Sequence, residues 1–412
     1  MTEATRPDTV NADALPEIWR YVAIDDFSLP ASPVIQSAKT FVDHVFERLG
    51  VRRRKDSEPV RSDEELGGID ANRIKRIVPQ PDWHCAADVL EKMLTELFAS
   101  GGTPHRVVVL TAPPWSGYRN ILEELTLREQ YSEILPPTAE QVFSNDGQWL
   151  KSFRHNRSIL VYPFLERTFF RHAGALDLIR RFMREAASGN HRPVILGCDS
   201  WSWAFLEPLW EGRKPLVITL QTFNEQQIGQ YFLDLADSGG SKGVFFRHAT
   251  TGNIILSAGD GSGSTPQSDN FLQMLASKSR GNIGVATAIW KASLMIERNN
   301  HKETAKEAAG LSRSRQTIWV RSFEKIVLPS VPSQNVHDSA ILLHTILLHG
   351  SLDVGLLHRL LPRMHTTPDA VLSLLEERGL VEEGDGTVSV SARGYPAVRQ
   401  FLKSEGYLVD AF

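Results

Sequence analysis

The sequence has few of the features that mark secreted, disulfide-bonded or membrane proteins. Its 412 residues include two cysteines, Cys85 and Cys198, which are too few for a disulfide framework or a zinc site. No apolar run approaches the roughly 20 residues that a helix needs to cross a bilayer. The start, MTEATRPDTVNADALPEIW, has neither a basic beginning nor an apolar run, so it does not read as a secretory signal. We therefore expect a cytoplasmic protein without a membrane span, in which both cysteines are buried thiols.

Excess positive charge is also missing. The chain has 45 Lys and Arg against 49 Asp and Glu, a net charge of -4, which gives no overall attraction to nucleic acid or to an anionic membrane. The basic run from Arg52 to Lys55 is diluted by acidic neighbours, and we interpret it as a solvated linker. What remains is an ordinary globular composition, 42% hydrophobic and 23% charged, in a chain long enough for two to three domains.

Short apolar runs alternate with amphipathic helices between residues 70 and 222. The runs are rich in β-branched residues and lack the polar alternation of a half-exposed strand, so both of their faces should be buried. They cover residues 106–111, 158–162, 193–197 and 216–220. Strands that alternate with helices predict an α/β fold with a parallel sheet and helices on both of its faces.

The segment after the first of these strands has the position of a phosphate-binding loop. Residues 112–119 read Ala-Pro-Pro-Trp-Ser-Gly-Tyr-Arg and lead directly into a helix. In a P-loop, backbone N–H groups at a helix N-terminus cradle phosphates, a lysine reaches the outer phosphates, and a Ser or Thr hydroxyl binds Mg²⁺. The segment resembles the GPPGSGKT loop of AAA+ ATPases, which it matches at Pro113, Pro114, Ser116 and Gly117. The resemblance implies a P-loop NTPase sheet.

The residues of this motif that handle phosphate and magnesium are replaced. Ala112 stands for the first glycine, Trp115 for a middle glycine, Tyr118 for the lysine and Arg119 for the threonine. Tyr118 has no ammonium group, and Arg119 has no hydroxyl to bind the metal. Trp115 places a large ring where phosphate would need open space. We therefore expect a loop that no longer supports hydrolysis.

The acidic motif that follows the second strand of such a core is also altered. In AAA+ ATPases this strand ends in Asp-Glu, whereas here it ends in Pro163-Phe164, and neither side chain can bind a metal or act as a base. Glu166 lies three residues after Pro163. It is either a displaced acid or a solvated loop carboxylate. We expect no catalytic residue and no metal ligand.

Two further segments resemble positions of the family. Residues 198–200, Cys-Asp-Ser, follow a strand at the place of the sensor-1 polar residue. Residues 279–282, Ser-Arg-Gly-Asn, resemble the sensor-2 region of origin-recognition and STAND-type ATPases, and the alternative for Arg280 is a helix-capping or interdomain salt-bridge role. If the altered loop still holds ATP or ADP, the resemblance gives the binding residues as Ser116, Gly117, Tyr118, Arg119 and Arg280.

The resemblance covers residues 70–412, rests on the order of its motifs, and suggests four parts. We expect a flexible N-terminal arm with a helix and a charged linker over 1–69, in which Trp19 and Tyr21 form a docking point. An AAA+-like α/β core over 70–222 and a helical lid over 223–330 follow. The lid carries a hairpin insertion at 244–258, and residues 331–412 resemble a winged-helix domain with a hairpin near 380–390.

The last part is a poor candidate for binding DNA. From Asp338 to the end the chain has ten Asp and Glu against six Lys and Arg, whereas DNA binding needs several cations on the docking face. Its histidines at 344, 349, 358 and 365 are better explained as core or capping residues than as a metal site. The dense aromatic segment around Trp201 and Trp203 is typical of a core or a protein interface.

Together these observations favour a non-hydrolysing AAA+/STAND-like regulatory or scaffold protein that acts through protein–protein contacts and needs no cofactor. Its partners would be a related active ATPase or further copies of this chain, not nucleic acid. One alternative is a nucleotide-binding switch that uses ATP or ADP in a non-standard P-loop. Another is a winged-helix DNA-binding regulator.

Overall fold

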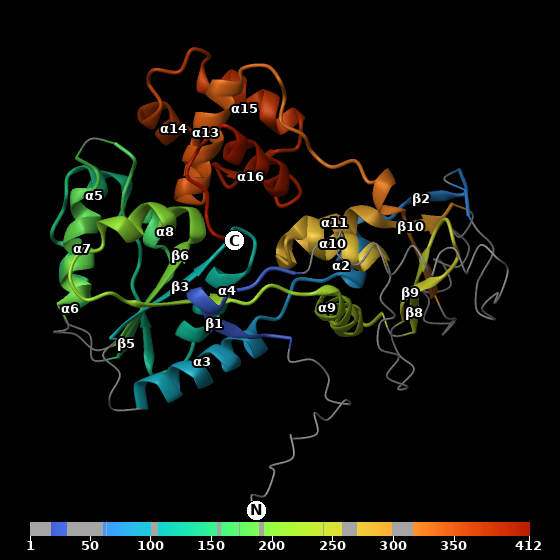
Figure 1. Ribbon diagram of the computed structural model, residues 1–412, viewed down its shortest axis with the longest axis horizontal. Coiled ribbons are helices and arrows are strands. Elements are labelled where there is room, and N and C mark those ends of the chain that lie inside the picture. Colours follow the sequence, from blue (N-terminus) through green and yellow to red (C-terminus); the bar gives the residue numbers. More distant parts are fainter. Residues whose placement is uncertain are drawn as a thin grey trace, which may run out of the picture.

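The computed structural model describes residues 18–30, 61–62, 64–99, 106–154, 158–172, 174–188, 193–241, 243–257, 270–298 and 316–412. These residues form three β-sheets and the helices that cover them (Figure 1). Among them, no helix is both long enough and apolar enough to cross a membrane. The helix expected within 1–69 and the basic run Arg52 to Lys55 lie outside the described residues.

The largest sheet is the parallel sheet that the sequence predicted. Its strand order is β1-β7-β3-β6-β5-β4, and every neighbouring pair is parallel except β1 with β7. The strands are β1 (Tyr21–Ala23), β3 (Val107–Ala112), β4 (Tyr131–Glu133), β5 (Ile159–Tyr162), β6 (Val194–Asp199) and β7 (Leu216–Leu220). The helices of this part are α3 (His84–Ala99), α4 (Tyr118–Thr126), α5 (Ala139–Phe143), α6 (Trp149–Arg154), α7 (Asp177–Ala187) and α8 (Ser200–Leu206). Every residue of β3 and β6 is buried, which explains why their sequences show no alternation.

Residues 18–30 differ from the predicted flexible arm. Strand β1 pairs with the edge strand β7, and the Tyr21 hydroxyl donates a hydrogen bond to the Ala86 carbonyl at 2.9 Å. The Trp19 ring packs edge-on against Phe223, with centroids 5.2 Å apart. Trp19 and Tyr21 are both 8% exposed, so they do dock, but onto the chain's own core. A strand of three residues is too short to give a periodic signal in the sequence.

A second sheet lies beside the lid helices and is larger than the predicted hairpin. The hairpin at 244–258 is present as β8 (Val244–His248) and β9 (Ile254–Ser257). Three strands join it in the order β2-β10-β11-β8-β9, namely β2 (Leu66–Gly68), β10 (Leu294–Glu297) and β11 (Gln316–Val320). The adjoining helices are α2 (Ala71–Ile77), α9 (Glu225–Ser238), α10 (Asn270–Ser279) and α11 (Ile283–Ser293). Strand β10 follows α11 directly within the predicted helical lid, where the sequence pattern does not separate the two because short apolar runs fit either structure.

Residues 336–404 contain the helices and hairpin expected of the last part. The elements are α13 (Val336–His349), β12 (Leu352–Asp353), α14 (Val354–Leu360), α15 (Pro368–Glu377), β13 (Val381–Gly384), β14 (Thr387–Val390) and α16 (Tyr395–Ser404). The three strands form an antiparallel sheet in the order β12-β14-β13. Helix α13 is apolar nearly all round, because it packs against α8 of the core as well as α15 and α16.

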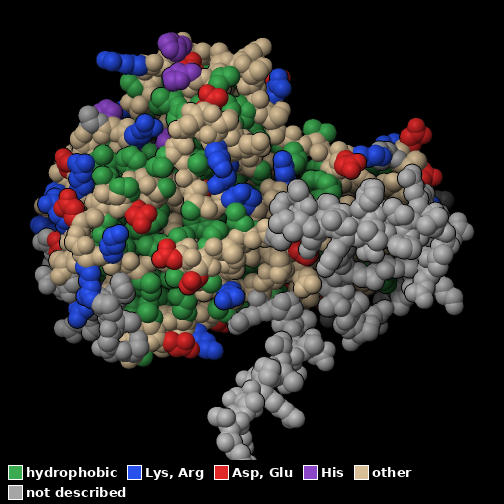
Figure 2. Space-filling view, in the orientation of Figure 1, with side chains coloured by type: hydrophobic (Ala, Val, Ile, Leu, Met, Phe, Trp, Pro, Cys, Tyr) green, Lys and Arg blue, Asp and Glu red, His purple; other side chains and the backbone are tan. Residues whose placement is uncertain are grey.

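The histidines of this part divide into two kinds. His344 and His349 are 5% and 2% exposed and belong to the core, as predicted. His358 is exposed, and its Nε2 lies 2.9 Å from an Asp369 carboxylate oxygen. Figure 2 shows histidine side chains gathered over the outer end of this part. Within the described part of the chain, no group of three or more His, Cys, Asp and Glu is arranged to hold a metal.

The aromatic segment of α8 joins the core sheet to the last part. Trp201 and Trp203 are 2% and 6% exposed, so the interpretation as core is confirmed. The Trp201 indole N–H donates to the Tyr395 hydroxyl at 3.0 Å, and its ring lies 6.1 Å from that of His344. Most buried apolar residues of the core, lid and last part form one continuous cluster, and Leu66, Ala249, Met295 and Trp319 form a second, smaller one. One cysteine prediction is wrong: Cys198 is buried, but Cys85 lies on the exposed side of α3.

Candidate functional site

The loop between β3 and α4 bends as a glycine-rich loop does, although one glycine position holds a tryptophan. Trp115 has φ 69° and Gly117 has φ 86°, both in the left-handed region that favours glycine. At Gly117 a side chain is also excluded by space, because a Cβ atom would lie 2.1 Å from the Trp83 ring. The loop therefore keeps its bend at Trp115 despite an unfavourable residue.

Trp115 points away from the core and toward the last part of the chain. Its indole N–H donates to the Val390 carbonyl at 3.0 Å, and 38% of the residue is exposed. The Asn282 side chain, at the start of α11, donates to the Pro114 carbonyl at 2.7 Å. A Cβ atom on Gly284 would lie 2.1 Å from the Trp115 carbonyl oxygen, so α11 packs directly on the loop. Trp115 thus attaches the loop to its neighbours. Its ring was predicted to fill the space that a phosphate would need, but it points toward the last part of the chain instead.

Tyr118 and Arg119 turn inward and meet Glu166. Tyr118 is 3% exposed, and its burial raises the pKa of the hydroxyl well above the usual value, so the hydroxyl keeps its proton. This hydroxyl accepts a hydrogen bond from Arg119 Nε at 3.0 Å and donates one to Glu166 Oε1 at 3.4 Å. Arg119 Nη2 lies 2.8 Å from the same carboxylate oxygen. Tyr118 and Arg119 therefore form a network with the buried acid Glu166.

Glu166 is fully buried and is not the solvated loop carboxylate that was one of its two interpretations. It lies in the short helix η2 (Leu165–Arg167) that follows β5. Its second oxygen, Oε2, accepts a hydrogen bond from the Asp199 backbone N–H at the end of β6, at 3.3 Å. Glu166 thus lies buried beside the end of β6 and pairs with Arg119, and its interpretation as a displaced acid stays a prediction.

Neighbouring groups make this corner unsuited to a metal. Burial raises the pKa of the Asp199 carboxyl well above its usual range, although the Arg119 charge opposes the shift. Asp199 accepts a hydrogen bond from Trp201 N–H and caps α8, so its side chain has a structural role. A Cβ atom at Gly350, the residue after α13, would lie 2.3 Å from Arg119 Nη2. The last part of the chain therefore closes over the arginine.

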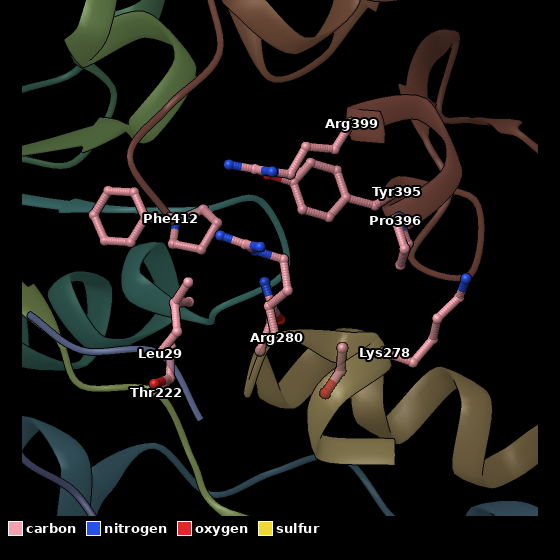
Figure 3. A pocket seen from close by; sticks show the side chains of 11 residues that line it. Leu29, Thr222, Lys278, Arg280, Tyr395, Pro396, Arg399 and Phe412 are labelled. Carbon is pink, nitrogen blue, oxygen red and sulfur yellow. The ribbon is translucent and has the colours of Figure 1, made fainter. Parts of the chain in front are cut away.

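A cleft opens on the other side of the loop. It lies between the core, the turn from α10 to α11, and α16, and consists of two adjoining pockets that are partly open to solvent. Pro113, Thr222, Asn282 and Phe412 line both pockets. The end nearer α16 carries three basic side chains, Lys278, Arg280 and Arg399 (Figure 3).

Two polar groups in the cleft lack partners in the part of the chain that the structure describes. The Ser116 hydroxyl oxygen is buried and makes no hydrogen bond, and the same is true of Arg280 Nε. Arg280 has φ 56°, and burial together with the charge of Arg399 lowers the pKa of its guanidinium. Of the predicted site residues, Ser116 and Arg280 therefore line one cleft. Tyr118 and Arg119 instead belong to the buried network, and Gly117 lies at the bend between.

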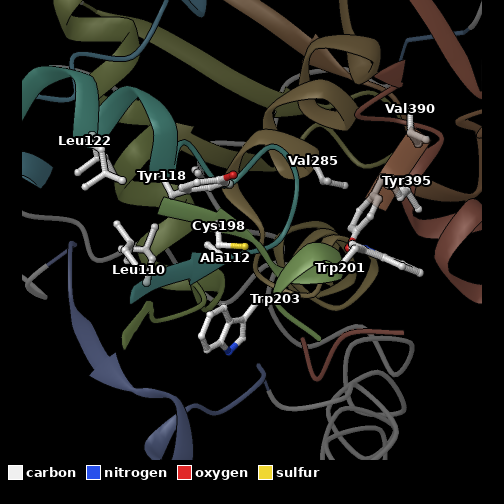
Figure 4. Close-up of a cluster of buried hydrophobic side chains, with 14 of the residues drawn as sticks. Leu110, Ala112, Tyr118, Leu122, Cys198, Trp201, Trp203, Val285, Val390 and Tyr395 are labelled. Carbon is white, nitrogen blue, oxygen red and sulfur yellow. The ribbon is translucent and has the colours of Figure 1, made fainter. Parts of the chain in front are cut away.

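Residues 405–412 also reach the cleft, where Phe412 lines both pockets, and no local pattern in the sequence indicates this. Asp410 is 5% exposed, and its Oδ1 lies 3.1 Å from Arg399 Nε. Its Oδ2 accepts hydrogen bonds from the Ser200 hydroxyl and, at 3.3 Å, from the Tyr395 hydroxyl. Figure 4 shows Tyr395 beside Trp201 at this junction. Only the mixture of apolar residues with one acid, Tyr-Leu-Val-Asp-Ala-Phe, distinguishes this segment from an ordinary tail.

Comparison with known proteins finds similar folds only among solved structures, because no family model and no curated protein matches the sequence. A Walker-type ATPase of Pyrococcus abyssi shares 14% identity at a TM-score of 0.32, over 84% of this chain and 98% of that one. The RuvB Holliday junction branch migration motor of Thermotoga maritima shares 13% at 0.31, over 85% and 98%. The ORC1 protein of Aeropyrum pernix, in complex with DNA, shares 14% at 0.32, over 81% and 97%. These identities and TM-scores are too low to support an argument about the fold. The α/β fold is therefore established by the parallel sheet of the chain itself.

Proposed function

We propose that this chain is a non-hydrolysing, AAA+-like regulatory or scaffold protein that acts through protein–protein contacts. The observation that carries the proposal is the buried network of Tyr118, Arg119 and Glu166. It occupies the corner where the resemblance would place the phosphate-binding lysine, the magnesium-binding hydroxyl and the acid.

Hydrolysis at this corner would require groups that are replaced or already engaged. Glu166 uses one oxygen for Arg119 and Tyr118, and the other for the Asp199 N–H. A Mg²⁺ ion bound there would have to displace the arginine, which repels it. Nor is there a free carboxylate to orient a water molecule, because Pro163 and Phe164 hold the positions after β5. The network thus replaces both the metal and the base.

We propose further that residues 331–412 form a winged helix that binds protein. Its exposed acidic side chains lie on α15 and on the β13–β14 hairpin: Asp369, Glu376, Glu377, Glu382, Glu383 and Asp385. A surface of this sign repels DNA and favours a basic protein surface. This supports a protein partner, such as a related ATPase, over the DNA-binding alternative.

Calorimetric titration of the purified chain with ATP and ADP, with and without Mg²⁺, tests the proposal when combined with an assay of phosphate release. We expect no phosphate release above the uncatalysed rate and no dependence of any nucleotide binding on Mg²⁺. Magnesium-dependent turnover that saturates with ATP would sink the proposal. Glu166→Gln is the matched control for any phosphate release that is seen. It keeps the size of the side chain and removes its charge, so it shows whether the release depends on the Glu166 carboxylate.

A nucleotide-binding switch without turnover is the second candidate, and the unpartnered Ser116 hydroxyl and Arg280 Nε favour it. Both groups line the cleft next to the N-terminus of α4, where phosphates are favoured by the helix dipole. In this case ADP binds without Mg²⁺, and Arg280→Ala weakens the binding. Arg119→Ala distinguishes the two arginines, because Arg119 is paired with Glu166 and should contribute little to binding.

A further inference from the structure

Residues 405–412 run from the end of α16 into the cleft as an extended segment. Its side chains differ in exposure: Leu408 is 52% exposed, whereas Asp410 and Phe412 are 5% and 6% exposed. Tyr407 lies on the inner side as well, with its ring centroid 4.9 Å from that of His344. The segment therefore buries Asp410 and Phe412 in the body of the protein and leaves Leu408 on its surface.

Asp410 supplies a negative charge to the basic end of the cleft. Arg399 contacts it twice, from Nε to Oδ1 and from Nη2 to the backbone carbonyl, both at 3.1 Å. The hydroxyls of Ser200 and Tyr395 donate to the other carboxylate oxygen. These contacts come from α8 and α16, so the carboxylate joins the core to the last part of the chain.

Phe412 supplies an aromatic ring to the apolar end. Its ring packs against Phe27, with centroids 4.7 Å apart and planes at 62°. It lines both pockets beside Pro113 of the loop and Thr222 after β7. The ring is therefore held between residues of the loop, the lid and the segment around β1 (Figure 3).

We infer that residues 407–412 are an intramolecular ligand of the cleft and that a nucleoside phosphate binds there only when they leave. The inference rests on the proposed function, in its form of a nucleotide-binding switch. Phe412 and Asp410 offer the two chemistries that a nucleoside phosphate offers, an aromatic ring and an anion. The segment and the nucleotide therefore compete for one site.

The segment satisfies the cleft incompletely, which makes it displaceable. Three cations, Lys278, Arg280 and Arg399, line the basic end, and Asp410 provides one carboxylate. Ser116 Oγ and Arg280 Nε remain without partners among the described residues. A ligand with several phosphate oxygens can pair with more of these groups. The apparent affinity for it is then reduced by the fraction of molecules in which the segment is out of the cleft.

Calorimetric titration with ADP tests the competition directly. The double variant Asp410→Ala/Phe412→Ala should bind ADP at least about tenfold more tightly than the wild type, because its open fraction is larger. Leu408→Ala is the matched control, since Leu408 lies on the same segment but faces solvent. It should bind ADP as the wild type does. Thermal unfolding of each variant verifies that it is folded.

Equal ADP affinity of the double variant and the wild type, or no ADP binding by the folded double variant, would overturn the inference. If the double variant does not fold, Asp410→Asn decides, because it keeps the shape and removes the charge; it should bind ADP more tightly than the wild type, and unchanged affinity overturns the inference. Phosphate release by the same variants reports separately on the proposed function. Turnover would contradict the absence of hydrolysis while leaving the competition intact.

Discussion

The two sides of the loop at 113–117 are closed in different ways. On the inner side, Tyr118, Arg119 and Glu166 form a network in which one cation meets one buried carboxylate. On the outer side, three cations line a cleft that a single carboxylate of residues 405–412 only partly neutralises. The inner side is closed by residues fixed in β3, α4 and η2, whereas the outer side is closed by an extended segment.

This difference between the two sides bears separately on ATP hydrolysis, at the inner side, and on ligand binding, at the outer side. Under the proposed function, hydrolysis would require several substitutions at once, because Tyr118 and Arg119 supply neither a lysine ammonium nor a serine or threonine hydroxyl and the Glu166 carboxylate is already engaged. Opening the outer side requires only that one segment move. The proposed function thus assigns no reaction to the inner side, and the inference above assigns to the outer side a ligand site that residues 407–412 control.

The largest expected effect of a single substitution is that of Glu166→Ala on the inner side. It removes the ion-pair partner of Arg119, whose side chain is 28% exposed and keeps a hydrogen bond to the neutral Tyr118 hydroxyl, so the free energy of unfolding should fall by about 3 kcal/mol. Urea unfolding measures it. The double variant Arg119→Met/Glu166→Leu should recover most of the loss, because it removes both charges together. A loss for Glu166→Ala no larger than that for the exposed Glu376→Ala would contradict the network.

Acidification should weaken the junction between α13 and the core. Burial lowers the pKa of both His344 and His349 to about 4, so both are neutral in the folded protein. The unfolded chain takes up these protons near pH 6.5. The stability that these histidines contribute is therefore complete above pH 6.5 and is lost as pH falls toward 4, by about 3 kcal/mol for each at the limit.

The variant His344→Asn/His349→Asn isolates this effect from other groups. Asp199 and Asp410 have raised pKa values and act in the opposite direction, so the wild type alone does not give the slope. Urea unfolding at pH 7 and at pH 4.5 should show a smaller loss for the variant than for the wild type. Parallel pH profiles of the two proteins would show that these histidines carry no such linkage.

Tyr395→Phe should have an intermediate effect, because it removes a hydroxyl shared by both regions. The hydroxyl accepts from Trp201 and donates to Asp410, so its loss leaves a buried indole N–H unpaired and costs about 1–3 kcal/mol. A double-mutant cycle with Trp201→Phe measures the coupling by chemical unfolding. Additive losses would mean that the two side chains do not interact.

The smallest effect is expected for Trp115→Gly. This substitution places a glycine where the GPPGSGKT loop of AAA+ ATPases has one. Glycine relieves the left-handed backbone at φ 69°, while the hydrogen bond to Val390 is lost, and each contributes about 1 kcal/mol with opposite sign. The free energy of unfolding should change by less than about 1 kcal/mol. Phosphate release should stay at background, because Tyr118 and Arg119 remain.

The sequence predicted the elements that have long or strongly patterned segments. The buried strands β3, β5, β6 and β7 and helix α16 were located from apolar runs and helical spacing. Strands β1 and β2 have three residues each, and β10 continues an apolar helix, so none of them produces a distinct period. Local pattern fails where a short strand is fixed by partners far away in the chain.

The candidate site was predictable only in part, for a related reason. The altered residues of the loop were visible in the order of the motifs. The pairing of Arg119 with Glu166 joins residues 47 positions apart, and the entry of Asp410 and Phe412 into the cleft joins α16 to β1 and α8. Contacts of this kind depend on how the parts pack, and no local spacing in the sequence records them.

The absence of ATP hydrolysis is best tested by single-turnover phosphate release, with protein in excess over ATP and with Mg²⁺ present. Because the protein is in excess, even one slow hydrolysis event per site is counted. If the chain does not hydrolyse ATP, phosphate is released at the uncatalysed rate. This holds both for the wild type and for the Asp410→Ala/Phe412→Ala variant, in which the cleft is open. Faster release that depends on Mg²⁺ and is abolished by Glu166→Gln would show that Glu166 serves catalysis. That result would contradict the proposal that the chain does not hydrolyse ATP.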